Sequence, residues 1–166
     1  GAASGFASTI ASGLMSPEGI CLDAVIANTA IAGVVGVAAA GLFAATPFLG
    51  AAAGGLLPNA SNLTRTLIQF GVTEGANLLG AGLIGGWASQ ESGVFLRQAD
   101  ADARWGHGYA NSALVQANYV RSEQQMSQDY WSGVRGGAWT YGVVRAAFAL
   151  SALRTSRPGT AVANAV

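Results

Sequence analysis

Few residues in this sequence are of types that could do chemistry. The chain has one histidine and one cysteine, His107 and Cys21, so it lacks the clusters that hold zinc or haem. Asp100 and Asp102 are two positions apart, and a helix would not place them on one face. No Ser/His/Asp, Cys/His or phosphate-loop pattern stands out. The sequence therefore predicts a protein that is not an enzyme, with no cofactor and no metal site.

One glycine motif matches a nucleotide-binding fingerprint. The stretch Gly80–Gly85 has the spacing G-x-G-x-x-G. That fingerprint works only when a strand comes just before the first glycine and a helix just after it. Residues 74–77 do not resemble a strand, and a chain with 24 glycines easily produces this spacing by chance. We expect helix here, and a strand ending at Leu79 would be needed to support dinucleotide binding.

Pairs of glycines four residues apart indicate helix packing instead. Such pairs let two helices approach closely in lipid. Five pairs occur, starting at Gly1, Gly50, Gly71, Gly82 and Gly133. Gly82 and Gly86 lie inside an apolar segment, where this packing can operate, and they are the predicted helix-packing residues.

The composition narrows the class of protein further. Hydrophobic residues make up 51% of the 166 residues and charged residues only 10%, against about 25% charged in a typical soluble domain. This excludes a disordered charged tail, and the single cysteine excludes a disulfide scaffold. Only four charged residues lie in 1–90, and the others lie in 91–166. The composition is typical of a membrane protein or of a subunit buried in a large assembly.

The longest apolar stretch runs from Ala24 to Ala45. It holds no charge, and about 20 such residues suffice to cross a bilayer as a helix. We predict a membrane span here; the alternative is a core helix buried in a soluble assembly. Pro47 is expected to end or kink this helix. Phe48 to Leu57 would then be a second apolar run, too short to span alone.

A second apolar segment runs from Thr64 to Trp87 and has Glu74 in its middle. A carboxylate in hydrocarbon costs about 2.5–3.5 kcal/mol, so Glu74 has to face other protein or water. Two interpretations stay open: a polar site inside a membrane, and a helix with one wet face in a protein assembly.

Residues 91–131 are polar and are predicted to form one long amphipathic helix outside the membrane. One face of that helix would carry an apolar stripe with spacings of four, four, four and three. The stripe consists of Trp105, Tyr109, Ala113, Ala117 and Val120. We expect it to pack on a partner.

Residues 132–157 are predicted to form a basic apolar helix, followed by a loose tail over 158–166. Arg145 disfavours a full membrane span unless it finds a partner or reaches the surface. No acid occurs from residue 132 onward. The basic residues of this part, expected to contact phosphate or lipid headgroups, are Arg135, Arg145, Arg154 and Arg157. Any nucleic acid would be bound through this part alone.

Together these patterns predict an all-α protein in a single domain over 1–166. Residues 1–90 form its apolar helical part, which is either membrane-embedded or buried in an assembly. The leading functional hypothesis is a non-enzymatic, membrane-interacting structural subunit of a larger multi-protein assembly, whose partners are other protein subunits and the lipid bilayer. The alternatives are a virion or phage internal protein that helps penetrate host membranes, and a soluble helical shell or scaffold protein.

Overall fold

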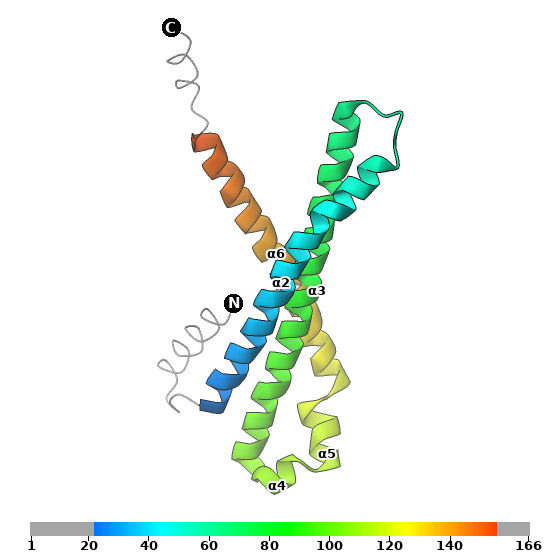
Figure 1. Cartoon of the computed structure of the whole chain (residues 1–166). Helices are drawn as coiled ribbons and strands as arrows, with labels where there is room; N and C mark the ends of the chain where they lie inside the picture. Colours follow the sequence, from blue (N-terminus) through cyan, green and yellow to red (C-terminus); the bar gives the residue numbers. More distant parts are fainter. Residues whose placement is uncertain (1–21, 156–166) are drawn as a thin grey trace.

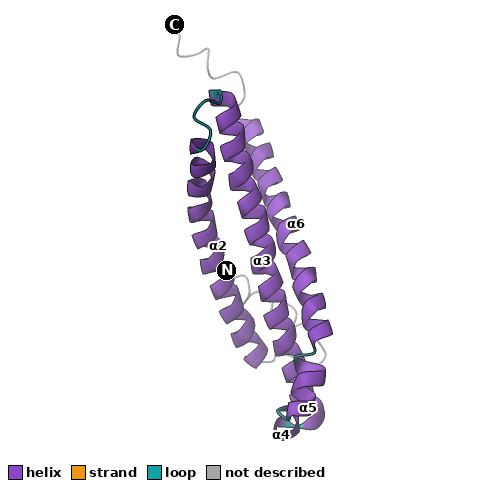
Figure 2. Ribbon diagram, turned by 90° about the vertical axis from the view of Figure 1, so that its right-hand side faces the viewer, coloured by secondary structure: helices purple, strands orange, loops and turns teal. Residues whose placement is uncertain are grey.

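The computed structural model describes residues 22–155 and confirms the all-α prediction. Within this range 91% of the residues are helical and none forms a strand. Three long helices dominate: α2 (Leu22–Gly55), α3 (Asn62–Trp105) and α6 (Glu123–Thr155). The helix α3 lies between the other two (Figure 2). Arg157 and the tail predicted over 158–166 lie outside the described residues.

Helix α2 continues through Pro47, which lies inside it, to Gly55. The expected end at Pro47 is therefore wrong, and Phe48 to Leu57 is not a separate apolar run. A proline inside a helix removes one backbone hydrogen bond, at a cost of about 3 kcal/mol. Contact with α3 on both sides of the proline offsets this cost. Thr73 of α3 donates a hydrogen bond to the Thr46 carbonyl at 3.5 Å, and the Gln69 side chain lies against Gly54.

Helix α3 joins two segments that the sequence separates at residues 90 and 91. It begins after Ser61, whose hydroxyl accepts a hydrogen bond from the Thr64 amide at 3.2 Å, as helix caps commonly do. It ends at Gly106, whose φ of 79° lies in the left-handed region that glycine adopts without strain. Helical packing against α2 and α6 continues across the change in polarity, so composition alone does not mark a boundary in the fold.

The chain reverses direction after α3, so the single helix predicted over 91–131 is wrong. Three short elements make the reversal: α4 (His107–Ala110), α5 (Ala113–Val115) and the π-helix η1 (Gln116–Val120). Gly106 ends α3, and Ser112 caps α5 by accepting a hydrogen bond from the Val115 amide at 3.4 Å. A small hydrophobic core lies between the end of α3 and the short elements of the reversal. It is made of Val94, Ala101, Ala110, Val115 and Val120.

Helix α6 begins at Glu123, nine residues before the predicted basic apolar helix. It runs antiparallel to α3 and crosses it, so that its C-terminal half departs from α3 (Figure 1). The hairpin of α3 and α6, together with α2, brings residues far apart in the sequence into contact, such as Glu74 and Arg145, which are 71 positions apart.

Candidate functional site

The predicted packing residues Gly82 and Gly86 lie on the face of α3 that meets α6. A methyl group at Gly82 would lie 3.4 Å from Cγ1 of Val134. At Gly86 a methyl group would lie 2.7 Å from Cγ2 of Val134 and 2.8 Å from Cε2 of Tyr130. Both positions are buried. Side chains of α6 therefore occupy the space that these two glycines leave open.

The closest approach of the two helices occurs at Gly85, a residue the sequence did not single out for packing. A methyl group there would lie 2.5 Å from the Gly133 carbonyl oxygen and 3.0 Å from the Gly137 Cα. At Gly137 it would lie 3.3 Å from the Gly85 Cα. The backbones of α3 and α6 thus touch. The spacing of Gly133 and Gly137, one of the five glycine pairs, is the sequence signal that accompanies this contact.

The nucleotide fingerprint has a packing role instead. Gly80–Gly85 lies in the middle of α3, with no strand before it, so the strand-turn-helix that a dinucleotide needs is absent here. A methyl group at Gly80 would lie 2.7 Å from Cδ1 of Leu42 on α2. The glycines at 82 and 85 face α6. The G-x-G-x-x-G spacing therefore serves two helix contacts on different sides of α3.

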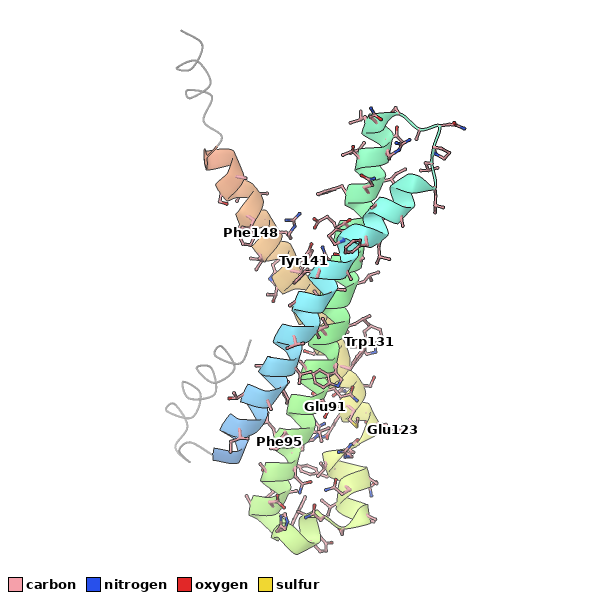
Figure 3. The ribbon with its side chains drawn as sticks, in the orientation of Figure 1. Glu91, Phe95, Glu123, Trp131, Tyr141 and Phe148 are labelled. Carbon is pink, nitrogen blue, oxygen red and sulfur yellow. The ribbon has the colours of Figure 1, made fainter. Side chains whose placement is uncertain are left out.

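A polar cluster joins α3 to α6 within the apolar part of the bundle. Tyr141 donates a hydrogen bond to Oε2 of Glu74 at 2.5 Å. Arg145 Nε donates to the same oxygen at 3.0 Å, and its Nη2 donates to Oε1. Glu74 therefore faces protein, and Arg145 has a partner 71 positions away in the sequence. Tyr141, which Figure 3 labels, also stacks on Phe43 of α2, with ring centroids 5.8 Å apart.

A second polar contact joins α2 to α3 near the same level. Thr46, only 1% exposed, donates a hydrogen bond to Oδ1 of Asn77 at 2.7 Å. Asn77 is itself buried and lies one helical turn from Glu74. A buried hydroxyl and amide satisfy each other here, as buried polar groups must. The three helices are thus linked by polar contacts at one level.

This cluster makes a testable prediction about stability. Glu74→Gln removes the charge opposite Arg145 and leaves the guanidinium without its partner, so it should destabilise the protein. Glu74→Gln combined with Arg145→Gln removes both charges and should cost less than the single change. Unfolding in mixed micelles, followed by circular dichroism, measures the double variant and both single variants, Glu74→Gln and Arg145→Gln. A double variant as unstable as the sum of its single changes would contradict a coupled pair.

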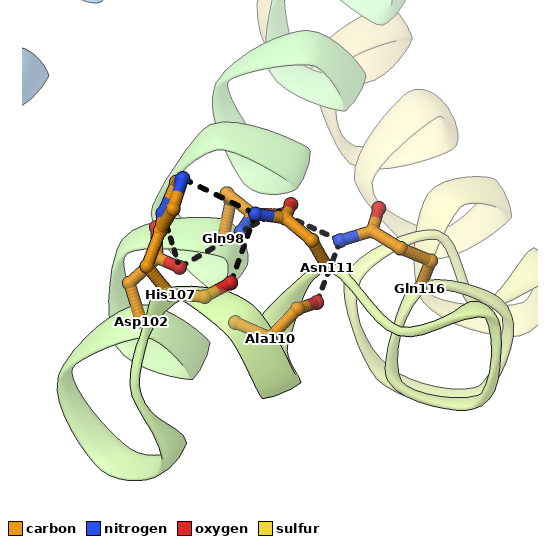
Figure 4. Close-up of polar contacts among 6 residues, drawn as sticks. All are labelled: Gln98, Asp102, His107, Ala110, Asn111 and Gln116. Carbon is orange, nitrogen blue, oxygen red and sulfur yellow. Dashed lines mark hydrogen bonds and ion pairs between the residues drawn. The ribbon is translucent and has the colours of Figure 1, made fainter.

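The chain reversal carries a dense polar network (Figure 4). Gln116 donates to Oε1 of Gln98 at 2.6 Å and to the Ala110 carbonyl at 2.9 Å. The His107 ring lies 3.2 Å from Oδ1 of Asp102, and Asn111 donates to the His107 carbonyl at 2.9 Å. These side chains and carbonyls hydrogen-bond to one another and stabilise the conformation of the chain reversal. Within residues 22–155 no three His, Cys, Asp or Glu side chains gather to hold a metal ion.

Three further hydrogen bonds tie the chain reversal and the start of α6 to α3. Arg97 donates to Oδ2 of Asp129 at 2.6 Å and to the Val120 carbonyl at 2.9 Å. Tyr119 donates a hydrogen bond to Asp100, and this bond raises the pKa of the Tyr119 hydroxyl above its ordinary value of 10.0. The hydrogen bond contributes its full stability at pH values below the ordinary tyrosine pKa. This stability is lost as pH rises through the higher pKa of Tyr119 in the folded protein.

We expect alkaline pH to loosen the reversal through this bond. Above the folded pKa, tyrosinate faces the Asp100 carboxylate, and the two like charges repel. Proteolysis around residues 106–122 should therefore accelerate in the native chain between neutral and strongly alkaline pH. Tyr119→Phe should be cleaved faster already at neutral pH and show a smaller further increase. Identical pH profiles for the two chains would contradict this role of Tyr119.

The predicted partner-packing stripe does not form one face. Trp105 ends α3, Tyr109 lies in α4, Ala113 in α5, and Ala117 and Val120 in η1. Val120 is buried in the small core, whereas the other four are exposed. These residues do not share one helical face, because the helix on which their spacing depends is interrupted at Gly106; their packing on a partner stays a prediction.

The predicted basic residues are distributed along α6 rather than gathered. Arg135 is exposed, and its Nε donates to the Trp131 carbonyl at 3.3 Å. Arg145 forms an ion pair with Glu74. Arg154 lies in the last turn of α6, and Arg157 lies outside the described residues. The residues that the structure describes therefore form no single phosphate-binding patch.

The long helices of the described residues expose an extensive apolar surface. Two helical stretches, Thr29–Gly55 and Asn62–Trp105, are long and apolar enough to cross a membrane. In the most apolar 18-residue window of each, only 6% and 11% of the residues are buried by the chain itself. No family model, curated protein or solved structure matches this chain. The candidate site is therefore this surface, and its chemistry is apolar.

Proposed function

We propose that the protein is a non-enzymatic structural subunit, embedded in a membrane, of a larger multi-protein assembly. The observation that carries the proposal is the exposure of the apolar faces of α2 and α3. Leu79 and Phe48, for example, are large hydrophobic residues that are 71% and 77% exposed, and each lies within a long uncharged stretch. A soluble monomer rarely exposes contiguous apolar surface on this scale.

The polar groups in the same part of the bundle support a lipid environment. The hydroxyl of Thr46, the amide of Asn77 and the charges of Glu74 and Arg145 all bond to the chain itself. Inside hydrocarbon, polar side chains have to pair with one another or face the bundle interior. In these contacts each polar side chain has a partner within the chain.

Small residues on the outside of the bundle support further helical partners. Gly71 and Gly75 of α3 and Gly41 of α2 lie in the apolar part, and a methyl group at any of them would meet no neighbouring atom. Gly71 and Gly75 are four apart, the spacing that lets a second helix approach closely in lipid. Neighbouring subunits would pack on these positions.

Alkaline carbonate extraction of the full chain from its native membranes tests the proposal. An embedded subunit stays in the membrane pellet, because its apolar helices remain covered by hydrocarbon. A soluble shell or scaffold protein is released into the supernatant, because its cover is other protein. Release of the chain by carbonate would overturn the proposal and favour the scaffold.

A further inference from the structure

We propose that the bundle sits in the bilayer at one defined depth, with hydrocarbon covering it from the level of Trp87 and Trp131 to the level of Arg65. This inference rests on the proposed membrane function and adds to it the depth and the sidedness of the chain. Its occupant is lipid, and four features of the structure argue for it.

The first feature is a pair of tryptophans at one level. Gly86 of α3 lies against the Tyr130 ring of α6, so the next residues, Trp87 and Trp131, lie at the same height on the two helices. Both rings are exposed. Tryptophan is enriched where a membrane meets water, because its ring is apolar and its N–H is polar. This level fits one boundary of the hydrocarbon.

The second feature is the distribution of charge about that level. Glu91 and Glu123 lie on one side of Trp131, and Tyr141 and Phe148 lie on the other (Figure 3). Arg135 starts one turn inside the boundary, but its side chain reaches back to the Trp131 carbonyl. Long basic side chains extend in this way to bring their charge to the surface.

The third feature is length. From Trp87 back to Arg65, α3 rises through 22 residues, about 33 Å at 1.5 Å per residue. In α6, 23 residues separate Trp131 from Arg154, about 35 Å. The hydrocarbon core of a bilayer is about 30 Å thick. Arg65 marks the far boundary of the proposed hydrocarbon-covered segment. Its guanidinium donates a hydrogen bond to the Pro58 carbonyl in the turn at 3.0 Å.

The fourth feature is the absence of unpaired charge between the two levels on α3. The one charged residue of α3 between Arg65 and Trp87 is Glu74, and Arg145 of α6 binds it through two nitrogens. The pair has no net charge. Helix α2 carries no charge from Ala24 onward. The segment thus carries no unpaired ion on α2 or α3 between the two levels, and the 46% exposed Arg145 of the pair has its countercharge in Glu74.

This depth determines sidedness. Between the two levels α6 runs antiparallel to α3 and diverges from it toward the far level, and α2 packs on α3. Three helices therefore cross the bilayer. The turn 56–61 and the end of α6 then lie on one side of the membrane. The chain reversal at 106–122 and the start of α2 lie on the other side.

Cysteine labelling of the full chain tests depth and sidedness. Cys21→Ser provides the background, and the protein is reconstituted into sealed vesicles of phosphatidylcholine with phosphatidylglycerol. Leu79→Cys and Leu96→Cys form a matched pair, because both leucines are exposed on α3, 71% and 57% respectively. We expect an impermeant maleimide to label Leu96→Cys readily. Leu79→Cys should react more than about tenfold more slowly, because hydrocarbon suppresses the thiolate, and should react fully after unfolding in SDS.

Asn59→Cys and Gly108→Cys report the two sides. In sealed vesicles they should be labelled in complementary fractions, and both should be labelled completely after the vesicles are permeabilised. Equal rates at positions 79 and 96, in a protein that still resists carbonate, would overturn the depth but leave the membrane proposal standing. Labelling of positions 59 and 108 from the same side would overturn the three crossings. Protection of position 79 that disappears on dilution with lipid would assign the face to a second copy and overturn lipid as its cover.

Discussion

Leu79→Arg is expected to prevent stable integration of the protein into membranes, whereas Leu96→Arg leaves integration nearly unchanged. Both leucines are exposed on α3, so neither substitution disturbs packing within the chain. Position 79 lies between the levels of Arg65 and Trp87, where an arginine costs about 2.5–3.5 kcal/mol of insertion free energy. That cost corresponds to a reduction of roughly 100-fold in the ratio of integrated to non-integrated protein.

Comparing Leu79→Arg with Leu96→Arg separates the effect of the lipid environment from any effect on the fold. Circular dichroism in detergent should give the same helix content for both variants, and carbonate extraction should release Leu79→Arg only. The contrast depends on depth, because position 96 lies nine residues beyond Trp87, among charged residues. Release of both variants, or of neither, would contradict hydrocarbon burial of this face of α3.

Gly133→Ala is expected to destabilise the protein by about 1–3 kcal/mol, the usual effect of overpacking a close contact. A methyl group there would lie 2.5 Å from the Ser89 Cβ and 2.8 Å from the Gly85 carbonyl carbon. The opposing group at Gly85 is backbone, so it cannot rotate away as a long side chain can. The helices α3 and α6 would have to separate, and the contacts of Tyr130 and Val134 with Gly86 would loosen with them.

Gly136→Ala provides the matched control on the same helix. Gly136 is exposed, and a methyl group there meets no neighbouring atom. Replacing a glycine by alanine inside a helix should stabilise it by about 0.5–1 kcal/mol. Unfolding in mixed micelles of increasing SDS content measures both variants against the native chain. A Gly133→Ala variant as stable as Gly136→Ala would show that the close contact does not hold the bundle together.

The amino-acid sequence by itself determined the fold class and the apolar character of the helices. The long uncharged stretches, and the scarcity of turn signals within them, allow helix but little else over most of the chain. The same local pattern was misleading at two places. Pro47 was expected to end or kink α2, and the spacing from Trp105 to Val120 was expected to continue one helix. Helix α2 does not end at Pro47, because it packs on α3 before and after the proline, whereas a glycine with positive φ at 106 ends the helix that the spacing suggested.

Only the tertiary structure decided which residues meet. The pair Glu74 and Arg145 and the contact of Gly85 with Gly133 join residues far apart in the sequence. Periodicity reports which side of a helix is apolar, but it carries no information on the register between two helices. That register follows from the close fit of backbone and side chains at the crossing. It sets the level of Trp87 beside Trp131, and with it the proposed depth of the bundle in a membrane.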